Sequence, residues 1–436
     1  MNDFYENEVQ QRAFFDAMAD AYARAASSLE VVEFIVLAGI GIELRFASEP
    51  LRQTLWPALR HLRQPGTAPR AVIRLWDKAG SGGIAAPPPP FDKRRFTDRG
   101  DIWGFDNRSF HLAFHYGEFS VNMFDRRAGQ GYYWVDDAAH LPYWSAAAPL
   151  RSQLHWCMER AGRQLLHAAA VGTPAGAVLL TGRGGVGKSS TALTALQEGM
   201  AFAGDDYVVV GLEPEPTVFP LYGSAKLHHD QIDLYPALQP WLKNPHGAAD
   251  EKAIFDIWAG FAENMPASMP IRAILVPEIA AGSQSEITAD IGINEVRYAA
   301  SFTTMEQLAC AGMQTEQFIG QLCRRVPGWR LRLGADRKAL VQVLRDGLAG
   351  PAPVAIAPAQ LTGRAVTPIS VVVPVYNRIH LVRGVIANVL EQNYPDLDLI
   401  VVDDGSTDGS AQVARSYPQA RVFEQPNSGP AQARNR

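Results

Sequence analysis

Cysteine is scarce in this sequence. The chain has 436 residues and three cysteines, Cys157, Cys310 and Cys323, which are widely spaced. A disulfide framework needs cysteines in pairs, and a zinc knuckle needs closely spaced ligands. Neither fits this pattern, so we expect a protein of a reducing compartment.

The sequence also lacks a basic N-terminus, a long apolar run and an excess of basic charge. Its first residues are acidic where a signal peptide is basic, and its longest apolar stretch, residues 31–44, contains Glu33 and Glu43. A membrane-spanning helix needs about 18 or more apolar residues. Nucleic-acid binders carry basic blocks, whereas the formal net charge here is −5. We therefore expect a cytoplasmic protein with no integral membrane segment and no nucleic-acid partner.

The composition is that of a folded globular protein, with 47% hydrophobic and 19% charged residues. A chain of this length exceeds one ordinary core, so several domains are expected. Alternating helical and strand patterns predict an α/β multidomain fold. The expected parts are a small N-terminal accessory α+β domain over 1–145, a phosphate-binding domain over 146–349, a Pro/Ala-rich linker over 350–367 and a further α/β module over 368–436.

Residues 1–145 show regular structure without concentrated chemistry. His111 and His115 lie four apart on one predicted strand and share a face, but no third ligand is near them in the sequence. We therefore expect structural or surface histidines. Apolar spacing predicts helices over 10–26 and 51–62 and strands over 31–46, 71–76, 110–124 and 131–135.

A glycine-rich loop dominates the middle of the chain. An apolar strand ends near Thr181, a helix begins near Ser190, and between them the sequence matches G-x-x-x-x-G-K-[ST]. In this motif backbone N–H groups bind phosphate, the lysine contacts the β- and γ-phosphates, and the serine hydroxyl holds Mg²⁺. The alternative is a Gly-rich turn into a helix. The candidate ATP-binding residues are Gly182, Gly184, Gly185, Gly187, Lys188, Ser189 and Ser190.

An acidic pair, Asp205 and Asp206, stands at the start of the apolar run that leads to Val210. Paired carboxylates beside a phosphate site can hold Mg²⁺ and accept the proton of an attacking hydroxyl. The alternative is a plain turn. Around the glycine loop we expect a helix over 143–166, two short strands joined by the turn 173–176, later strands near 270–277 and 326–334, and a closing helix over 337–348.

Residues 145–350 resemble HPr kinase/phosphorylase and its P-loop relatives, most closely over 167–210. The resemblance rests on His167, the glycine loop with its helix, and the acidic pair. It implies a PEP-carboxykinase-like P-loop fold, with His167 beside the transferred phosphoryl group and Asp205 or Asp206 as general base. Ser189 and Asp205 are the implied metal ligands.

The sequence departs from that family after Val210, where the second signature loop of HPr kinases is not evident. The expected phosphoryl acceptor is therefore a hydroxyl-bearing peptide, protein or metabolite rather than HPr in particular. Lys226 and Lys252 are expected to be solvated and are left out of the site.

Residues 368–436 predict a βαβ unit and resemble family-2 glycosyltransferases of the GT-A (Rossmann-like) fold. The matching segments are Val373 to Asn377, Gln392 to Pro395, Val401 to Asp408 and Asn427 to Asn435. The resemblance implies a nucleotide-sugar donor, such as a UDP-sugar, held by Pro374, Tyr376, Asp403 and Asp404, with Arg434 as a weaker candidate. One of the two aspartates alternatively caps a helix.

The chain ends at Arg436, before the Asp-x-Asp motif and the catalytic base of that family. We therefore expect an incomplete nucleotide-diphospho-sugar transferase domain, because an unfinished parallel sheet exposes strand edges.

Two functions follow from these patterns. The first is an ATP- and Mg²⁺-dependent phosphotransferase joined to a glycosyltransferase with an unknown acceptor. In the alternative, a catalytically inert ATP-binding module, or a scaffold, regulates the glycosyltransferase. An oligomer is compatible with the sequence, which predicts no particular state.

Overall fold

The computed structural model describes residues 2–66, 68–91, 96–97, 99–102, 105–247, 251–280, 282, 284–349, 369–390 and 396–435. The chain forms two compact units, Met1–Ile356 and Ala357–Arg436. The predicted linker, 350–367, and the motif Gln392 to Pro395 lie outside the described residues. The predicted boundary at residue 145 falls inside the first unit and stays a prediction.

The first unit begins with a six-stranded sheet in the order β1-β2-β3-β6-β5-β4. Strands β2, β3 and β6 pair in parallel, and the other neighbours are antiparallel. The six strands are β1 (Val31–Leu37), β2 (Ile40–Phe46), β3 (Ala71–Asp77), β4 (Phe110–His115), β5 (Ser120–Asp125) and β6 (Gln130–Val135).

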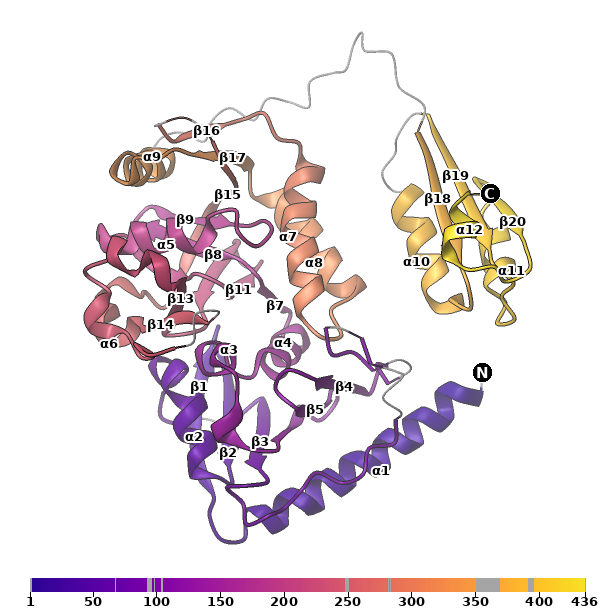
Figure 1. Cartoon of the computed structure of the whole chain (residues 1–436), viewed down its shortest axis with the longest axis horizontal. Coiled ribbons are helices and arrows are strands. Elements are labelled where there is room, and N and C mark those ends of the chain that lie inside the picture. The colour runs from indigo at the N-terminus through magenta and orange to yellow at the C-terminus, as the bar shows by residue number, and fades with distance from the viewer. Residues whose placement is uncertain are drawn as a thin grey trace. The chain divides into compact units, whose positions relative to one another are not determined.

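Helices cover both faces of this sheet (Figure 1). Along one face runs α1 (Asn2–Ala25), which buries Met18 and Tyr22 beside Trp76. Against the other face pack α2 (Glu49–Leu55) and α4 (Arg151–Arg160). The short helical pieces nearby are η1 (Trp56–Ala58), η2 (Arg60–Leu62), η4 (Ala138–His140) and α3 (Tyr143–Ala147).

The predicted helix over 143–166 is wrong in its extent. It is broken at Leu150, whose φ is +56°, and it ends at Arg160, just before Gly162 with φ +70°. A left-handed glycine stops a helix at this point because only glycine adopts that conformation without steric cost. The last four residues form β7 (Arg163–Leu166).

A nine-stranded sheet follows, in the order β10-β8-β9-β15-β12-β11-β7, with β17 beside β15 and β16 beside β17. The strand before the glycine loop is central and is parallel to β15. The strands are β8 (Ala169–Thr173), β9 (Gly176–Leu180), β10 (Ala201–Gly204), β11 (Val208–Gly211), β12 (Thr217–Pro220), β15 (Met269–Ile279), β16 (Glu286–Thr288) and β17 (Gly328–Leu333).

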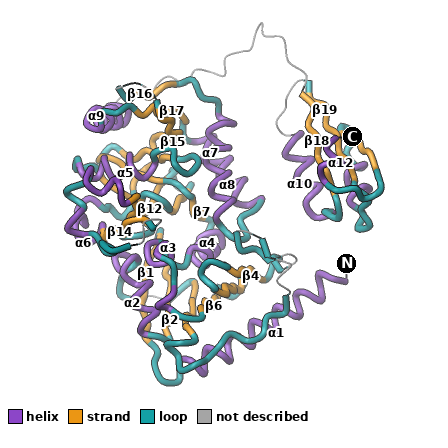
Figure 2. The backbone as a smooth tube through the Cα atoms, in the orientation of Figure 1, coloured by secondary structure: helices purple, strands orange, loops and turns teal. Residues whose placement is uncertain are grey.

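The nine-stranded sheet is also covered on both faces. One face packs on α5 (Lys188–Gln197), α9 (Arg337–Ala349) and the hairpin β13 (Ser224–His228) with β14 (Lys252–Asp256). The other packs on α7 (Ile293–Gln307) and α8 (Met313–Arg325). Figure 2 shows these helices on either side of the strands of the nine-stranded sheet. The remaining short helices are η5 (His229–Leu234), η6 (Gln239–Trp241), α6 (Ile257–Phe261) and η7 (Ala262–Asn264).

The two sheets of the first unit share one hydrophobic core. Ile73 of β3, Trp156 of α4 and Val209 of β11 belong to the same cluster of buried residues. This continuity explains why Met1–Ile356 forms one compact unit.

The second unit has a three-stranded parallel sheet in the order β18-β19-β20. This arrangement confirms the predicted βαβ pattern. Its elements are β18 (Ile369–Val375), α10 (Ile379–Leu390), β19 (Leu397–Asp403), α11 (Ser410–Arg415), β20 (Ala420–Glu424) and α12 (Pro430–Asn435). None of the described helices in either unit has the length and apolarity to span a bilayer. The cytoplasmic location stays a prediction.

Candidate functional sites

The glycine loop connects β9 to α5, as the sequence predicts. Gly182 has φ +139° and Gly187 has φ +97°, so both occupy conformations that side chains disfavour. A Cβ atom on Gly187 would lie 2.5 Å from Cδ1 of Leu333. The loop therefore needs glycine at this position for backbone conformation and for space.

Two features of the loop fit a bound phosphate. In the described part of the chain, the amides of Gly184 and Gly185 donate no hydrogen bond, so both are available to an anion. The Lys188 ammonium group donates to the carbonyl oxygens of Gly182, at 2.7 Å, and Arg183, at 3.0 Å. Burial lowers the pKa of Lys188 to about 8. Backbone donors and a lysine thus gather at the N-terminus of α5, where the helix dipole also favours negative charge.

Three side chains from distant segments meet beside the loop. One carboxylate oxygen of Asp206 accepts from Lys226 Nζ at 2.6 Å, and the other lies 3.1 Å from His167 Nε2. The Lys226 side chain is only 14% exposed. The expectation of a solvated Lys226 is therefore wrong, because β13 places this lysine against the acidic pair.

The two aspartates have opposite electrostatic environments. Burial and the charge of Asp206 raise the pKa of Asp205 to about 6. Burial alone would also raise the pKa of Asp206, but Lys226 and His167 hold it well below its ordinary value. Burial lowers the pKa of His167, although Asp206 opposes this effect. Asp206 therefore stays ionised well below neutral pH, whereas Asp205 takes up a proton near pH 6.

The loop and this cluster line one cleft of about 400 Å³. Gly182 contributes through the carbonyl that holds Lys188, whereas Asp205 lines a small neighbouring cavity. Residues that the sequence left out also line the cleft, namely Lys226, His228, Gln231, Lys252 and Arg337. Of the predicted residues, the cleft brings together His167, Gly184, Gly185, Gly187, Lys188, Ser189, Ser190 and Asp206.

The predicted metal ligands Ser189 and Asp205 meet through the backbone. The Ser189 hydroxyl donates to the main-chain carbonyl of Asp205 at 3.3 Å, and the Asp205 carboxylate accepts from the Lys226 amide at 3.1 Å. Their joint role as metal ligands stays a prediction.

In the second unit, Asp403 ends β19 at the carboxyl edge of the parallel sheet. Its Oδ1 accepts from the Ser406 amide at 2.7 Å, while its buried Oδ2 has no partner in the described part of the chain. Pro374 is half-buried and Tyr376 is 46% exposed at the end of the neighbouring strand. An unpaired buried carboxylate oxygen costs free energy unless a ligand satisfies it.

Asp404 has a structural role in the same loop. Its carboxylate accepts from the Gln425 side chain at 2.7 Å and from the amides of Ser428 and Gly429 at 2.9 and 2.8 Å. These donors, with the Gln425 side-chain amide first, lower the pKa of Asp404. Asp404 thus anchors the segment before α12, and Arg434 on that helix is exposed.

Comparison with known proteins gives different results for the two units. Residues 370–436 match Glycosyl transferase family 2. An uncharacterized glycosyltransferase of Rickettsia felis is 39% identical over 72 residues, 16% of this chain and 12% of that protein. Escherichia coli YibD, an uncharacterized glycosyltransferase, is 36% identical over 72 residues, 16% of this chain and 21% of that protein. Bacillus subtilis TuaG, a putative teichuronic acid biosynthesis glycosyltransferase, is 36% identical over 73 residues, 16% of this chain and 29% of that protein.

The chain therefore spans between about an eighth and a third of the length of these relatives. Among solved structures, the Hpr(Ser) kinase/phosphatase from Coxiella burnetii aligns with 27% of this chain and 59% of its own, at 16% identity and a TM-score of 0.19. A TM-score this low carries no argument about the first unit. The similarity to glycosyltransferase family 2 belongs to the C-terminal unit, residues 370–436.

Proposed function

We propose that the C-terminal unit binds the nucleotide part of a nucleotide-sugar donor, such as a UDP-sugar, for transfer to an acceptor. The unpartnered Oδ2 of Asp403 carries this proposal. It stands at the carboxyl ends of parallel strands, where open α/β sheets bind ligands. The segment's similarity to glycosyltransferase family 2 supports the same ligand class.

Calorimetric titration of the whole chain with UDP and UDP-glucose tests this proposal. We expect Asp403→Asn to weaken binding by about ten-fold or more, because a carboxylate–ligand hydrogen bond contributes roughly 1.5–3 kcal/mol. Asp398→Asn is the matched control, since Asp398 lies on the same strand and pairs with Arg421 on the surface. Equal affinities in wild type and Asp403→Asn would contradict the proposal.

For the first unit we propose phosphoryl transfer from ATP to a hydroxyl-bearing peptide, protein or metabolite. The ionised Asp206, held by Lys226 and His167 in the cleft that Lys188 also lines, carries this proposal. A site that only bound ATP would not need a half-buried, charge-stabilised carboxylate there. The free amides of the glycine loop, Lys188 and Ser189 fit a triphosphate.

In the proposed reaction the acceptor hydroxyl oxygen forms a bond to the γ-phosphorus. The bond from that phosphorus to the β–γ bridging oxygen breaks, ADP leaves, and the hydroxyl proton passes to the Asp206 carboxylate. Lys188 stabilises the negative charge of the phosphates. The Ser189 hydroxyl would hold Mg²⁺, which neutralises phosphate charge when bound.

Mass spectrometry after incubation with Mg-ATP and libraries of peptides and serine-like metabolites tests phosphoryl transfer. We expect Asp206→Asn to keep ATP binding and to lose product formation by about a hundred-fold or more, as for removal of a general base. Asp230→Asn is the control, because Asp230 is exposed on η5 near the cleft. ATP binding with no phosphorylated product would favour the alternative of an inert ATP-binding module that regulates or scaffolds the glycosyltransferase.

A further inference from the structure

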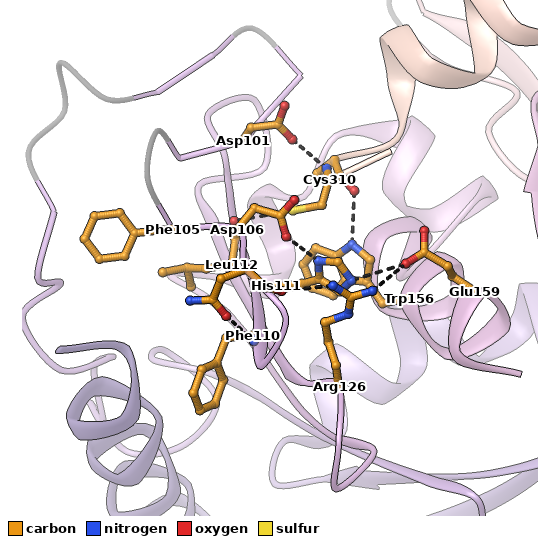
Figure 3. Close-up of polar contacts among 12 residues, drawn as sticks. Asp101, Phe105, Asp106, Phe110, His111, Leu112, Arg126, Trp156, Glu159 and Cys310 are labelled. Atoms are coloured by element: carbon orange, nitrogen blue, oxygen red, sulfur yellow. Dashed lines mark hydrogen bonds and ion pairs between the residues drawn. The ribbon is translucent and has the colours of Figure 1, made fainter. Parts of the chain in front are cut away.

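A third group of chemically active side chains lies in the first unit, outside the cleft that the glycine loop lines. Asp106 precedes β4, His111 lies on β4, and Cys310 lies between α7 and α8. One ligand atom of each residue lies within 4.8 Å of the others (Figure 3). The fold thus brings Cys310 from a distant part of the sequence to His111 and Asp106, and His115 does not belong to the group.

The three donors form a mixed set of carboxylate oxygen, imidazole nitrogen and thiol sulfur. Zn²⁺ and related divalent transition metals bind all three types, at about 2.0–2.3 Å from the metal. Ligands of a tetrahedral ion are then roughly 3.3–3.8 Å apart. The observed atoms lie within 4.8 Å of one another, so an ion would draw the more distant of them together by up to roughly 1–1.5 Å.

The imidazole of His111 is held from both of its nitrogens. Nδ1 lies 2.7 Å from Asp106 Oδ1, and Nε2 lies 3.6 Å from Glu159 Oε1. Glu159 in turn accepts from Arg126 at 3.2 Å. Metal-binding histidines commonly direct their second nitrogen at a carboxylate, which fixes the tautomer and the ring orientation. Glu159, which itself pairs with Arg126, is therefore an independent sign that His111 is a metal ligand.

Packing also fixes the ring and the sulfur. The His111 ring stacks on Trp156, with centroids 5.2 Å apart and planes at 20° (Figure 3). Cys310 has φ +61°, which is unusual for a residue other than glycine, and its amide donates to Asp101 Oδ1 at 2.6 Å. Strained backbone of this kind persists where the surroundings hold it and often marks a functional position.

We propose that Asp106, His111 and Cys310 bind one divalent transition-metal ion of the zinc class. The ion would replace the hydrogen bond between Asp106 and His111 and link β4 to the segment between α7 and α8. Three protein ligands leave one coordination position of a tetrahedral ion open. The side chain of Asp106 is 46% exposed, so water or a small ligand can reach that position.

Metal titration of the whole chain, freed of metal with a chelator, tests this proposal. Co²⁺ is the spectroscopic probe, because a thiolate ligand produces a charge-transfer absorption band. We expect one equivalent of Co²⁺ to bind with this band, Zn²⁺ to displace it and Mg²⁺ to leave it unchanged. Wild-type protein that binds no equivalent, or binds one without the thiolate band, would overturn the proposal and leave a metal-free hydrogen-bond network.

Variants identify the ligands. We expect Cys310→Ser to abolish the band, while Cys157→Ser and Cys323→Ser keep it as buried-cysteine controls.

Asp106 lies on the exposed side of the site, so Asp106→Asn is the second test of the ligands if Cys310→Ser does not fold. We expect it to lower Zn²⁺ affinity by about ten-fold or more, and Glu159→Gln by roughly ten- to a hundred-fold. A band that survives in Cys310→Ser, or unchanged affinity in Asp106→Asn, would contradict the assignment. His115→Gln, on the same strand but bonded to Ser152, is expected to behave as wild type.

Discussion

At the scale of single residues, the charge in the cleft that the glycine loop lines is set by which groups pair. Asp206 pairs with both Lys226 and His167, and Asp205 is left with a backbone donor and a like charge beside it. Adjacent aspartates, alike in sequence, thus differ in their electrostatic surroundings. Asp206 keeps its charge well below neutral pH, whereas Asp205 is partly protonated near pH 6.

The buried Lys188 predicts a pH dependence of ATP binding. Its pKa of about 8 means that the ammonium form is present below pH 8 and is lost as the pH rises. Because phosphate binding needs this cation, we expect the dissociation constant for ATP to be level below about pH 7 and to rise by up to about ten-fold per pH unit above 8. Calorimetric titration with ATP at a series of pH values between about 7 and 9.5 measures this dissociation constant.

Lys188→Arg is the control for this prediction, since arginine keeps its charge throughout the range. Its affinity for ATP is expected to be lower overall but independent of pH. A level wild-type profile between about pH 7 and 9.5 would show that Lys188 does not control binding.

Substitutions of the two aspartates are expected to change stability in opposite directions. The folded-state pKa of Asp205, about 6, exceeds its ordinary value of 3.8. Ionisation of this carboxyl group therefore destabilises the folded protein as the pH rises from 3.8 to about 6. Asp205→Asn should therefore raise the unfolding free energy at pH 7 by on the order of 1–3 kcal/mol, with no gain at pH 3.8 or below. Asp206→Asn should lower it by up to roughly 3 kcal/mol, because Lys226, whose side chain is only 14% exposed, loses its ionised partner.

Denaturant unfolding of the two variants at pH 7 and at lower pH measures these effects. Changes of the same sign at pH 7 would show that the aspartates do not differ in the way that their contacts imply.

At the scale of elements, the strand–loop–helix around the glycines is the best-predicted part of the chain. The apolar run, the glycines and the helical spacing are all local, so they specify β9, the loop and α5 directly. The β18–α10–β19 pattern was predictable for the same reason. The helix over 143–166 was overextended because apolar spacing continues through Arg163–Leu166, where pairing with β11 decides in favour of a strand.

The glycine loop predicts a contrast between two Gly→Ala substitutions. At Gly187 a methyl group meets Leu333 and the backbone has φ +97°, so Gly187→Ala should cost roughly 1–3 kcal/mol and abolish ATP binding. At Gly184 an added methyl group would meet no atom within 4 Å and φ is not positive, so Gly184→Ala should change stability by about 0.5 kcal/mol or less. Denaturant unfolding measures the stability of both variants, and titration with ATP measures their binding. Similar unfolding free energies for the two variants would contradict this account.

At the scale of the whole molecule, the two sheets of the first unit share one hydrophobic core. Trp156 lies at its centre, 1% exposed, with its indole N–H donating to the Ala309 carbonyl at 3.0 Å. The same ring packs on His111 and Phe124. A helix from one part of the sequence thus joins the six-stranded sheet to the segment between α7 and α8.

Trp156→Ala is therefore expected to destabilise both sheets together, by about 3–5 kcal/mol. Hydrogen–deuterium exchange should show equal loss of protection in β5 and β9. Tyr116→Ala, at a site 82% exposed on the β4–β5 turn, is the control and should change stability by about 0.5 kcal/mol or less. Loss of protection confined to β5 would instead support a separate domain over 1–145.

The sequence by itself determined the features that depend on neighbours along the chain. These are the glycine loop between β9 and α5, the acidic pair after it and the βαβ start of the C-terminal unit, because turn conformation and apolar periodicity are set by consecutive residues. Only the tertiary structure decided which side chains meet. It paired Lys226 with Asp206 and brought Cys310 to His111, because sheet packing places together groups that are far apart in sequence.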